Sequence, residues 1–112
     1  KDTTESLIGS RETFYGYYKD EILCGIISYK LQDNVLDIHR LMVHPSFFRL
    51  GIAKKLLDYV FGINDVEKAI VSTALLNEPA IRFYEKYGFQ KEKEIKVNEN
   101  LSLVTFQMRC KK

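Results

Sequence analysis

The residues of this sequence best suited to hold an anion lie in one stretch, residues 44–57, where a loop leads into an apolar repeat. The stretch contains no acidic residue but three cations, Arg49, Lys54 and Lys55. Because the helix dipole is positive at a helix start, each cation in the first turn costs up to ~1 kcal/mol. Gly51 lets a ligand approach the backbone, and free N–H groups at a helix start bind phosphate oxygens. The pattern indicates a phosphate site, but a solvated basic loop with a tight turn at Gly51 would have the same composition.

Three apolar runs precede this stretch, and the elements that they form must position it. They cover residues 13–19, 23–31 and 35–43, and short polar segments at 19–21 and 32–34 separate them. Runs of β-favouring residues joined by such turns predict an antiparallel meander of three strands.

The spacing of the apolar residues changes after the third run. Ile52, Leu56 and Val60 recur every four residues, with Lys54 on the opposite side. This spacing predicts an amphipathic helix of about ten residues, closed by Gly62 in a left-handed cap.

The second half of the chain continues with alternating element types. A short apolar run at 69–75 suits a buried strand, and residues 79–87 form a predicted helix that stops at Gly88. Two more strands are predicted at 89–97 and 101–109. The order β-β-β-α-β-α-β-β predicts an α/β (α+β) domain with a mostly antiparallel mixed sheet and flanking helices.

Length and composition exclude several classes of protein. The 112 residues, 46% of them hydrophobic, predict one domain, and a net charge of +2 gives no argument for a nucleic-acid surface. The longest apolar stretch, residues 22–29, is too short to span a bilayer, and the start does not resemble a signal peptide. Cys24 and Cys110 are far apart and form no metal-binding motif with the two histidines. We therefore expect a cytoplasmic protein with reduced thiols and no metal.

Two segments resemble motifs of one enzyme superfamily. The run LMVHPSFFRLGIAKKLL (residues 41–57) resembles the acyl-CoA-binding motif V-x-P-x-x-[RQ]-x-x-G-x-[GA] of the GNAT superfamily of N-acetyltransferases. NEPAIRFYEKYGF (residues 77–89) resembles that family's N-x-x-A-x-x-x-Y-x-x-x-G-F segment. The resemblance covers about residues 13–108. It implies an acyl-CoA N-acyltransferase-like fold and transfer of an acetyl group from acetyl-CoA, as co-substrate, to a primary amine in a ternary complex.

The sequence departs from the family pattern in two places. Phe48 stands where the family usually has Arg or Gln, which leaves Arg49 to contact phosphate from a different angle. About twelve residues precede Thr13, so we expect the family's N-terminal strand and helices to be largely absent from this single domain, residues 1–112.

By resemblance, main-chain groups of the third strand and the loop, together with side chains of both helices, form the acetyl-CoA site. The implied set is Leu41, Met42, Val43, Phe48, Arg49, Leu50, Gly51, Ile52, Ala53, Lys54, Asn77, Ala80, Phe83, Tyr84 and Lys86.

The implied reaction needs a group that accepts a proton. An ammonium of pKa near 10.4 loses its proton at a cost of ~4–5 kcal/mol at pH 7, and a neutral imidazole can accept it. Alternation along the third strand predicts two faces: Asp37, His39, Leu41 and Val43 on one, Ile38, Arg40 and Met42 on the other. His39 is the candidate base, with Asp37 as an alternative base or an orienting partner. The alternative is an ordinary half-buried ring beside a solvated charge.

Tyr84 holds the position that is usually the general acid of the family. Full proton transfer from a phenol of pKa near 10 to a thiolate of pKa near 8.5 is uphill, so we expect a hydrogen bond to the departing sulfur. The alternative is an aromatic core stripe that Tyr84 forms with Phe83 and Tyr87.

Three functions remain open from the sequence. The first is an N-acetyltransferase for an amine of a small molecule, peptide or protein. The second is an acyl-CoA-binding GNAT-like sensor or partner module with little catalysis, and the third is a phosphate-binding module unrelated to CoA. The expected partners are acetyl-CoA and an amine acceptor, without nucleic acid or membrane, for a monomer or homodimer.

Overall fold

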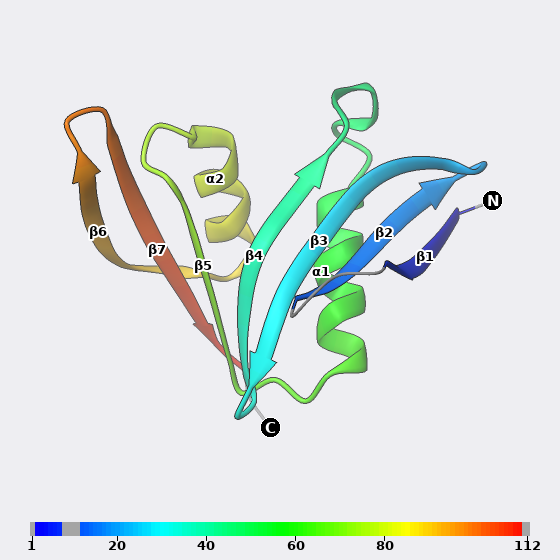
Figure 1. Ribbon diagram of the computed structural model, residues 1–112, viewed down its shortest axis with the longest axis horizontal. Coiled ribbons are helices and arrows are strands. Elements are labelled where there is room, and N and C mark those ends of the chain that lie inside the picture. Colours follow the sequence, from blue (N-terminus) through cyan, green and yellow to red (C-terminus); the bar gives the residue numbers. More distant parts are fainter. Residues whose placement is uncertain (1, 8–11, 111–112) are drawn as a thin grey trace.

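The computed structural model describes residues 2–7 and 12–110 as one seven-stranded sheet with two helices (Figure 1). The elements are β1 (Asp2–Leu7), β2 (Thr13–Lys19), β3 (Ile22–Gln32), β4 (Val35–Val43), a 3₁₀ turn (Pro45–Phe47), α1 (Ile52–Ile63), β5 (Lys68–Ala74), α2 (Glu78–Tyr87), β6 (Gln90–Asn98) and β7 (Leu101–Arg109). The strand order is β1-β2-β3-β4-β5-β7-β6. The predicted fold class is confirmed. Neither helix of the described residues combines the length and the hydropathy that a membrane span requires.

Two central strands, β4 and β5, run parallel and then separate. Their pairing extends only from Val35↔Lys68 to Ile38↔Val71. Beyond this point β4 stays paired with β3, and β5 stays paired with β7. The carboxyl ends of β4 and β5 therefore diverge and open a V in the middle of the sheet, as Figure 1 shows.

Both helices pack on the same face of the sheet and contact each other. The Tyr87 hydroxyl of α2 donates to Asp58 Oδ1 of α1 at 2.7 Å, and the rings of Phe61 and Tyr87 stack 6.0 Å apart. In Figure 1, α1 lies behind β3. The side chains buried between sheet and helices include Ile27, Leu36, Leu56, Leu57, Val60 and Phe106. No helix formed by the described residues covers the opposite face, which we call the helix-free face.

A β-bulge interrupts β4 at His39. Ser28 pairs with Arg40, and the next residue of β3, Tyr29, pairs with Ile38, so His39 has no partner in the ladder. A bulge places two consecutive side chains on one face and redirects the strand.

The bulge makes the predicted alternation of β4 wrong beyond Ile38. Paired residues share a face, and Leu41 and Val43 pack with Ile38 against the helix-covered core instead of lying with His39. The helix-free face carries Asp37, His39, Arg40 and Met42.

The start of the chain also differs from the expectation. A strand does precede the meander, since β1 pairs antiparallel with β2 from Asp2↔Lys19 to Leu7↔Phe14. The expected absence of an N-terminal strand is therefore wrong. The expectation about the family's helices concerns the segment between Leu7 and Thr13, most of which lies outside the described residues.

The helix ends follow the sequence prediction at α2 but not at α1. Gly88 closes α2 with a φ of 129°, as predicted. In contrast, α1 continues through Gly62 and stops before Asn64, whose Nδ2 donates to the Val60 carbonyl at 2.9 Å and to the Tyr29 hydroxyl at 3.1 Å. A polar side chain therefore ends α1 in place of the glycine cap.

Candidate functional site

The divergence of β4 and β5 creates a cleft of about 290 Å³. It is lined by three segments: Ile38, His39, Arg40, Leu41 and Met42 of β4; Val71, Ser72 and Thr73 of β5; and Asn77, Ala80 and Tyr84 at α2. Six of the predicted site residues line the cleft: His39, Leu41 and Met42 on β4, and Asn77, Ala80 and Tyr84 at α2. Ligands of open sheets with parallel strands bind outside the carboxyl ends of those strands, which is where this cleft lies.

Tyr84 packs in the core and also lines the cleft. Its ring is buried, with 5% exposure, and packs edge-on against Phe83 and Phe89 at centroid distances of 5.3 and 5.5 Å. Its hydroxyl makes no hydrogen bond with any residue that the structure describes. Every fully buried polar side-chain atom in that part of the chain has a hydrogen-bond partner, so the Tyr84 hydroxyl oxygen is not fully buried. The hydroxyl therefore reaches the cleft, where it can donate a hydrogen bond.

Burial also decides what the Tyr84 hydroxyl can do. It raises the pKa of Tyr84 to about 12, because the phenolate form would lose its solvation. Transfer of a full proton to a thiolate is then less favourable than for a free phenol. The neutral hydroxyl remains a hydrogen-bond donor throughout the neutral and mildly alkaline range.

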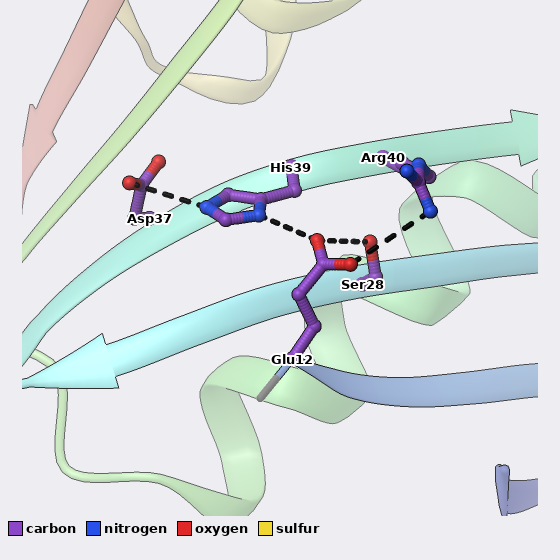
Figure 2. Close-up of polar contacts among 5 residues, drawn as sticks. All are labelled: Glu12, Ser28, Asp37, His39 and Arg40. Carbon is purple, nitrogen blue, oxygen red and sulfur yellow. Dashed lines mark hydrogen bonds and ion pairs between the residues drawn. The ribbon is translucent and has the colours of Figure 1, made fainter. Parts of the chain in front are cut away.

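His39 lies on the β4 side of the cleft between two carboxylates (Figure 2). Its Nδ1 is 2.5 Å from Glu12 Oε2, and its Nε2 is 3.4 Å from Asp37 Oδ2. The imidazole is 29% exposed, so solvent or a ligand can reach it. The bulge at His39 places the next residue, Arg40, on the same face, so both side chains reach Glu12.

Glu12 is a residue that the sequence analysis missed. Its carboxylate also accepts from Ser28 Oγ at 3.3 Å and lies 3.7 Å from Arg40 Nη1 (Figure 2). Burial raises the pKa of Glu12, but the hydrogen bond with His39 and the charge of Arg40 outweigh this and hold it below its usual value of 4.5. Glu12 is therefore ionised at neutral pH. No local pattern could indicate it, because its partner is 27 positions away.

The loop before α1 has the backbone form of an anion cradle. Arg49 and Gly51 have left-handed φ angles of 70° and 74°, and α1 starts at Gly51 without a capping side chain or an acidic residue in its first turn. The first intrahelical bond there is Lys55 N–H to the Gly51 carbonyl. The N–H groups of Ile52, Ala53 and Lys54 have no intrahelical acceptor. A Cβ at Gly51 would meet no atom within 4 Å, so the space above the turn is open to a ligand. The residues present fit a pyrophosphate.

The cations of this loop are less free than the sequence indicates. Lys54 Nζ binds Asp58 Oδ2 at 2.9 Å, and Lys55 Nζ lies 3.3 Å from the Tyr17 hydroxyl. Arg49 has no ion pair or hydrogen bond within the described part of the chain, and Phe48 beside it is 58% exposed. Of the three cations, Arg49 is thus the one without a protein partner there.

Four other predicted residues lie away from the cleft lining. Val43 packs on the helix-covered face, and Phe83 contacts the ring of Tyr87. Lys86 is exposed near the end of α2, and Leu50 is 48% exposed in the loop. The geometry gives Phe83 a packing role.

The arrangement of motifs, cleft and loop corresponds to a known family. The family model for the acetyltransferase (GNAT) domain matches residues 10–91, which is most of the chain. The chain belongs to the GNAT acetyltransferase family. It is 40% identical over 109 residues to UPF0157 protein YqkA of Bacillus subtilis, covering 96% of this chain and 32% of that protein. The chain thus spans about a third of the length of this curated relative.

Solved structures of GNAT proteins share the fold. A GNAT family acetyltransferase from Elizabethkingia anophelis with acetyl-CoA bound superposes with a TM-score of 0.78 at 19% identity, covering 89% of this chain and 77% of that one. The ribosomal-protein-S18-alanine N-acetyltransferase of Escherichia coli gives a TM-score of 0.79 at 14% identity, with 91% and 71% covered. At these identities the likeness shows the fold.

Proposed function

We propose that this GNAT domain is an N-acetyltransferase that transfers the acetyl group of acetyl-CoA directly to a primary amine in a ternary complex. The observation that carries the proposal is the cleft between the diverging ends of β4 and β5, which has His39 on one wall and the Tyr84 hydroxyl on the other. The family assignment and the acetyl-CoA bound to the Elizabethkingia neighbour support acetyl transfer as the general reaction.

The proposed acetyl-CoA site follows from the backbone groups that lack protein partners. The N–H groups at the start of α1 would hold the pyrophosphate, with Arg49 adding charge. Main-chain groups of Leu41 and Met42, which β5 does not pair, would bind the amide groups of the pantetheine arm. Lys54 would contribute only by leaving Asp58, which makes it the less direct of the two cations.

The proposed chemistry assigns one step to each wall of the cleft. His39 accepts a proton from the acceptor ammonium, and the neutral amine attacks the thioester carbonyl. The new C–N bond forms as the C–S bond breaks, and the amine's second proton leaves to solvent or to the sulfur. Tyr84 donates a hydrogen bond to the sulfur as negative charge develops there. A preorganised donor in a water-poor site stabilises such charge more than water does.

The proposal is tested by following free thiol release from acetyl-CoA with a panel of amines. The panel contains an alkyl monoamine, a polyamine, a peptide with a free α-amino group and a peptide with only lysine amines. We expect thiol release that depends on the amine and produces one acetylated amine per thiol. The matched control is Tyr84→Phe, which should slow release with each active amine. Binding of acetyl-CoA without amine-dependent release for any class would contradict the proposal and favour a binding module.

A further inference from the structure

Glu12 is the least exposed charged group around His39 and is held from three sides. Its side chain is 16% exposed, against 47% for Asp37 and 55% for Arg40. His39 Nδ1, the hydroxyl of the buried Ser28 and Arg40 Nη1 surround its carboxylate. A carboxylate fixed in this way defines the orientation of the ring it binds.

The contact between Glu12 and His39 also determines where the ring carries its hydrogen. An ionised carboxylate can only accept hydrogen bonds, so a distance of 2.5 Å to Nδ1 requires a hydrogen on Nδ1. A neutral imidazole carries a single hydrogen, which leaves a lone pair on Nε2. Asp37 Oδ2, at 3.4 Å, lies beyond the usual range of an N–H···O bond, so Nε2 is not committed to it.

We propose that Glu12 is a positioning residue that fixes His39 as the Nδ1–H tautomer, so that Nε2 is the atom that accepts the proton of the acceptor ammonium. The inference rests on the proposed function for its catalytic part. One N–H bond of the ammonium breaks and one N–H bond forms at Nε2. The resulting imidazolium donates its Nδ1–H to the Glu12 carboxylate, which stabilises the positive charge, and the proton then leaves to solvent.

The chain contains its own reference for the opposite tautomer. His44 Nδ1 accepts a hydrogen bond from the Ser46 backbone N–H at 3.1 Å, so a neutral His44 carries its hydrogen on Nε2. Because His39 and His44 are the only two histidines, the inference predicts one of each tautomer in the same protein.

The first experiment needs no substrate. Ring-nitrogen NMR shifts of the protein are measured at a pH where the rings are neutral, and a His44→Gln variant assigns the two sets of signals. We expect the Nδ1–H form for His39 and the Nε2–H form for His44. In Glu12→Gln, whose amide can accept or donate, His39 should populate both tautomers while His44 is unchanged. An Nε2–H form for His39 in the wild type would overturn the inference even if the protein is an active acetyltransferase.

The second experiment is a double-mutant cycle in turnover with an accepted amine. Glu12→Gln should lower kcat by about ten- to a hundred-fold, less than the 10²–10⁴-fold that a general base contributes, with the KM for acetyl-CoA unchanged. In a His39→Gln background the same change should alter kcat less than about twofold, because Glu12 acts through His39. Glu99→Gln, in the exposed turn between β6 and β7, is the control for loss of a charge. Equal effects of Glu12→Gln in both backgrounds would contradict the inference. If the wild type releases no thiol with any amine, the proposed function fails together with the catalytic part, and the NMR result still decides the tautomer.

Discussion

The two helices begin in opposite ways, although both border the proposed acetyl-CoA site. At α2, the Asn77 side chain accepts the Ala80 N–H at 3.3 Å, and Glu78 adds an acidic residue to the first turn. At α1, Gly51 provides no side chain, and the first turn has no acidic residue. Helix starts are usually closed in the first way, because their N–H groups need acceptors. The start of α2 thus finds a side-chain acceptor within the protein, whereas the start of α1 has no capping side chain.

The two helices should therefore contribute differently to function. In our proposal α1 acts through its backbone, which holds the pyrophosphate, and α2 acts through the side chain of Tyr84. Substitutions at the start of α1 should change the affinity for CoA, and a substitution of Tyr84 should change the turnover rate.

The largest effect is expected at the start of α1. Gly51→Asp places a negative charge where the pyrophosphate would bind, and like charges brought together cost several kcal/mol, roughly a hundred- to a thousand-fold in affinity. Calorimetric titration with CoA measures this loss, while circular dichroism checks the fold. The control is Gly51→Asn, which has the same shape without the charge and tolerates a left-handed φ angle. Unchanged CoA affinity in a folded Gly51→Asp protein would remove the pyrophosphate from this loop.

A smaller but separable effect is expected in α2. Tyr84→Phe keeps the ring packing and removes only the hydroxyl, so turnover should fall about ten- to a thousand-fold while CoA affinity stays nearly unchanged. Stability should change by roughly 1 kcal/mol or less. Steady-state kinetics and calorimetry on the same preparation make the comparison. Equal turnover in wild type and variant would leave Tyr84 with its core role alone.

Removal of the Asn77 cap tests whether α2, unlike α1, depends on a capping side chain at its start. Asn77→Ala deletes the side chain that accepts the Ala80 N–H, and loss of such a cap costs about 1 kcal/mol. Chemical denaturation should show this decrease in the free energy of unfolding, and Asn77→Ser, which retains a capping oxygen, should restore most of it. If Asn77→Ala is as stable as the wild type, α2 does not depend on its cap.

The smallest effect concerns the contact that holds the two helices together. Burial raises the pKa of Asp58, but hydrogen bonds from Tyr87 and Lys54 outweigh this and hold it below its usual value of 3.8. A lowered pKa in the folded state means that the ionised group stabilises the fold above about pH 4 and that this contribution is lost as the pH falls further. Asp58→Asn should reduce the loss of unfolding free energy below about pH 4 by a few tenths of a kcal/mol, because the pair is half exposed and screened by solvent. Denaturant titrations from neutral pH to about pH 3 measure the slope, and an unchanged slope would contradict the assignment.

Local periodicity predicted the elements well. The bounds of β2, β4 and β7 agree with the predicted ranges, because apolar alternation and the polar turns between strands are properties of neighbouring residues. The two motifs predicted one acetyl-CoA site, and the structure places residues of both along one cleft: Leu41 and Met42 from the first, and Asn77, Ala80 and Tyr84 from the second.

Features that depend on distant residues were not predicted. The bulge at His39 arises from the register between β3 and β4, which alternation within one strand does not contain. The contact of Glu12 with His39 depends on the same pairing, together with the entry of the chain into β2. The end of α1 depends on Asn64 reaching Tyr29 on β3, so Gly62 was a misleading local indication.

The separation of β4 and β5 gives the sheet two internal edges. Past Ile38 and Val71, the polar backbone groups that each strand directs toward the other have no strand opposite them. Amide hydrogens on these edges should exchange with solvent faster than those of the same strands that face β3 or β7. An extended ligand arm with amide groups could pair with them as an added strand does, and would slow that exchange. In the free protein, the same edges can also template pairing with another chain, as unprotected sheet edges do. The opening in which we propose that acetyl-CoA binds thus also creates a risk of aggregation, which the bound ligand would remove.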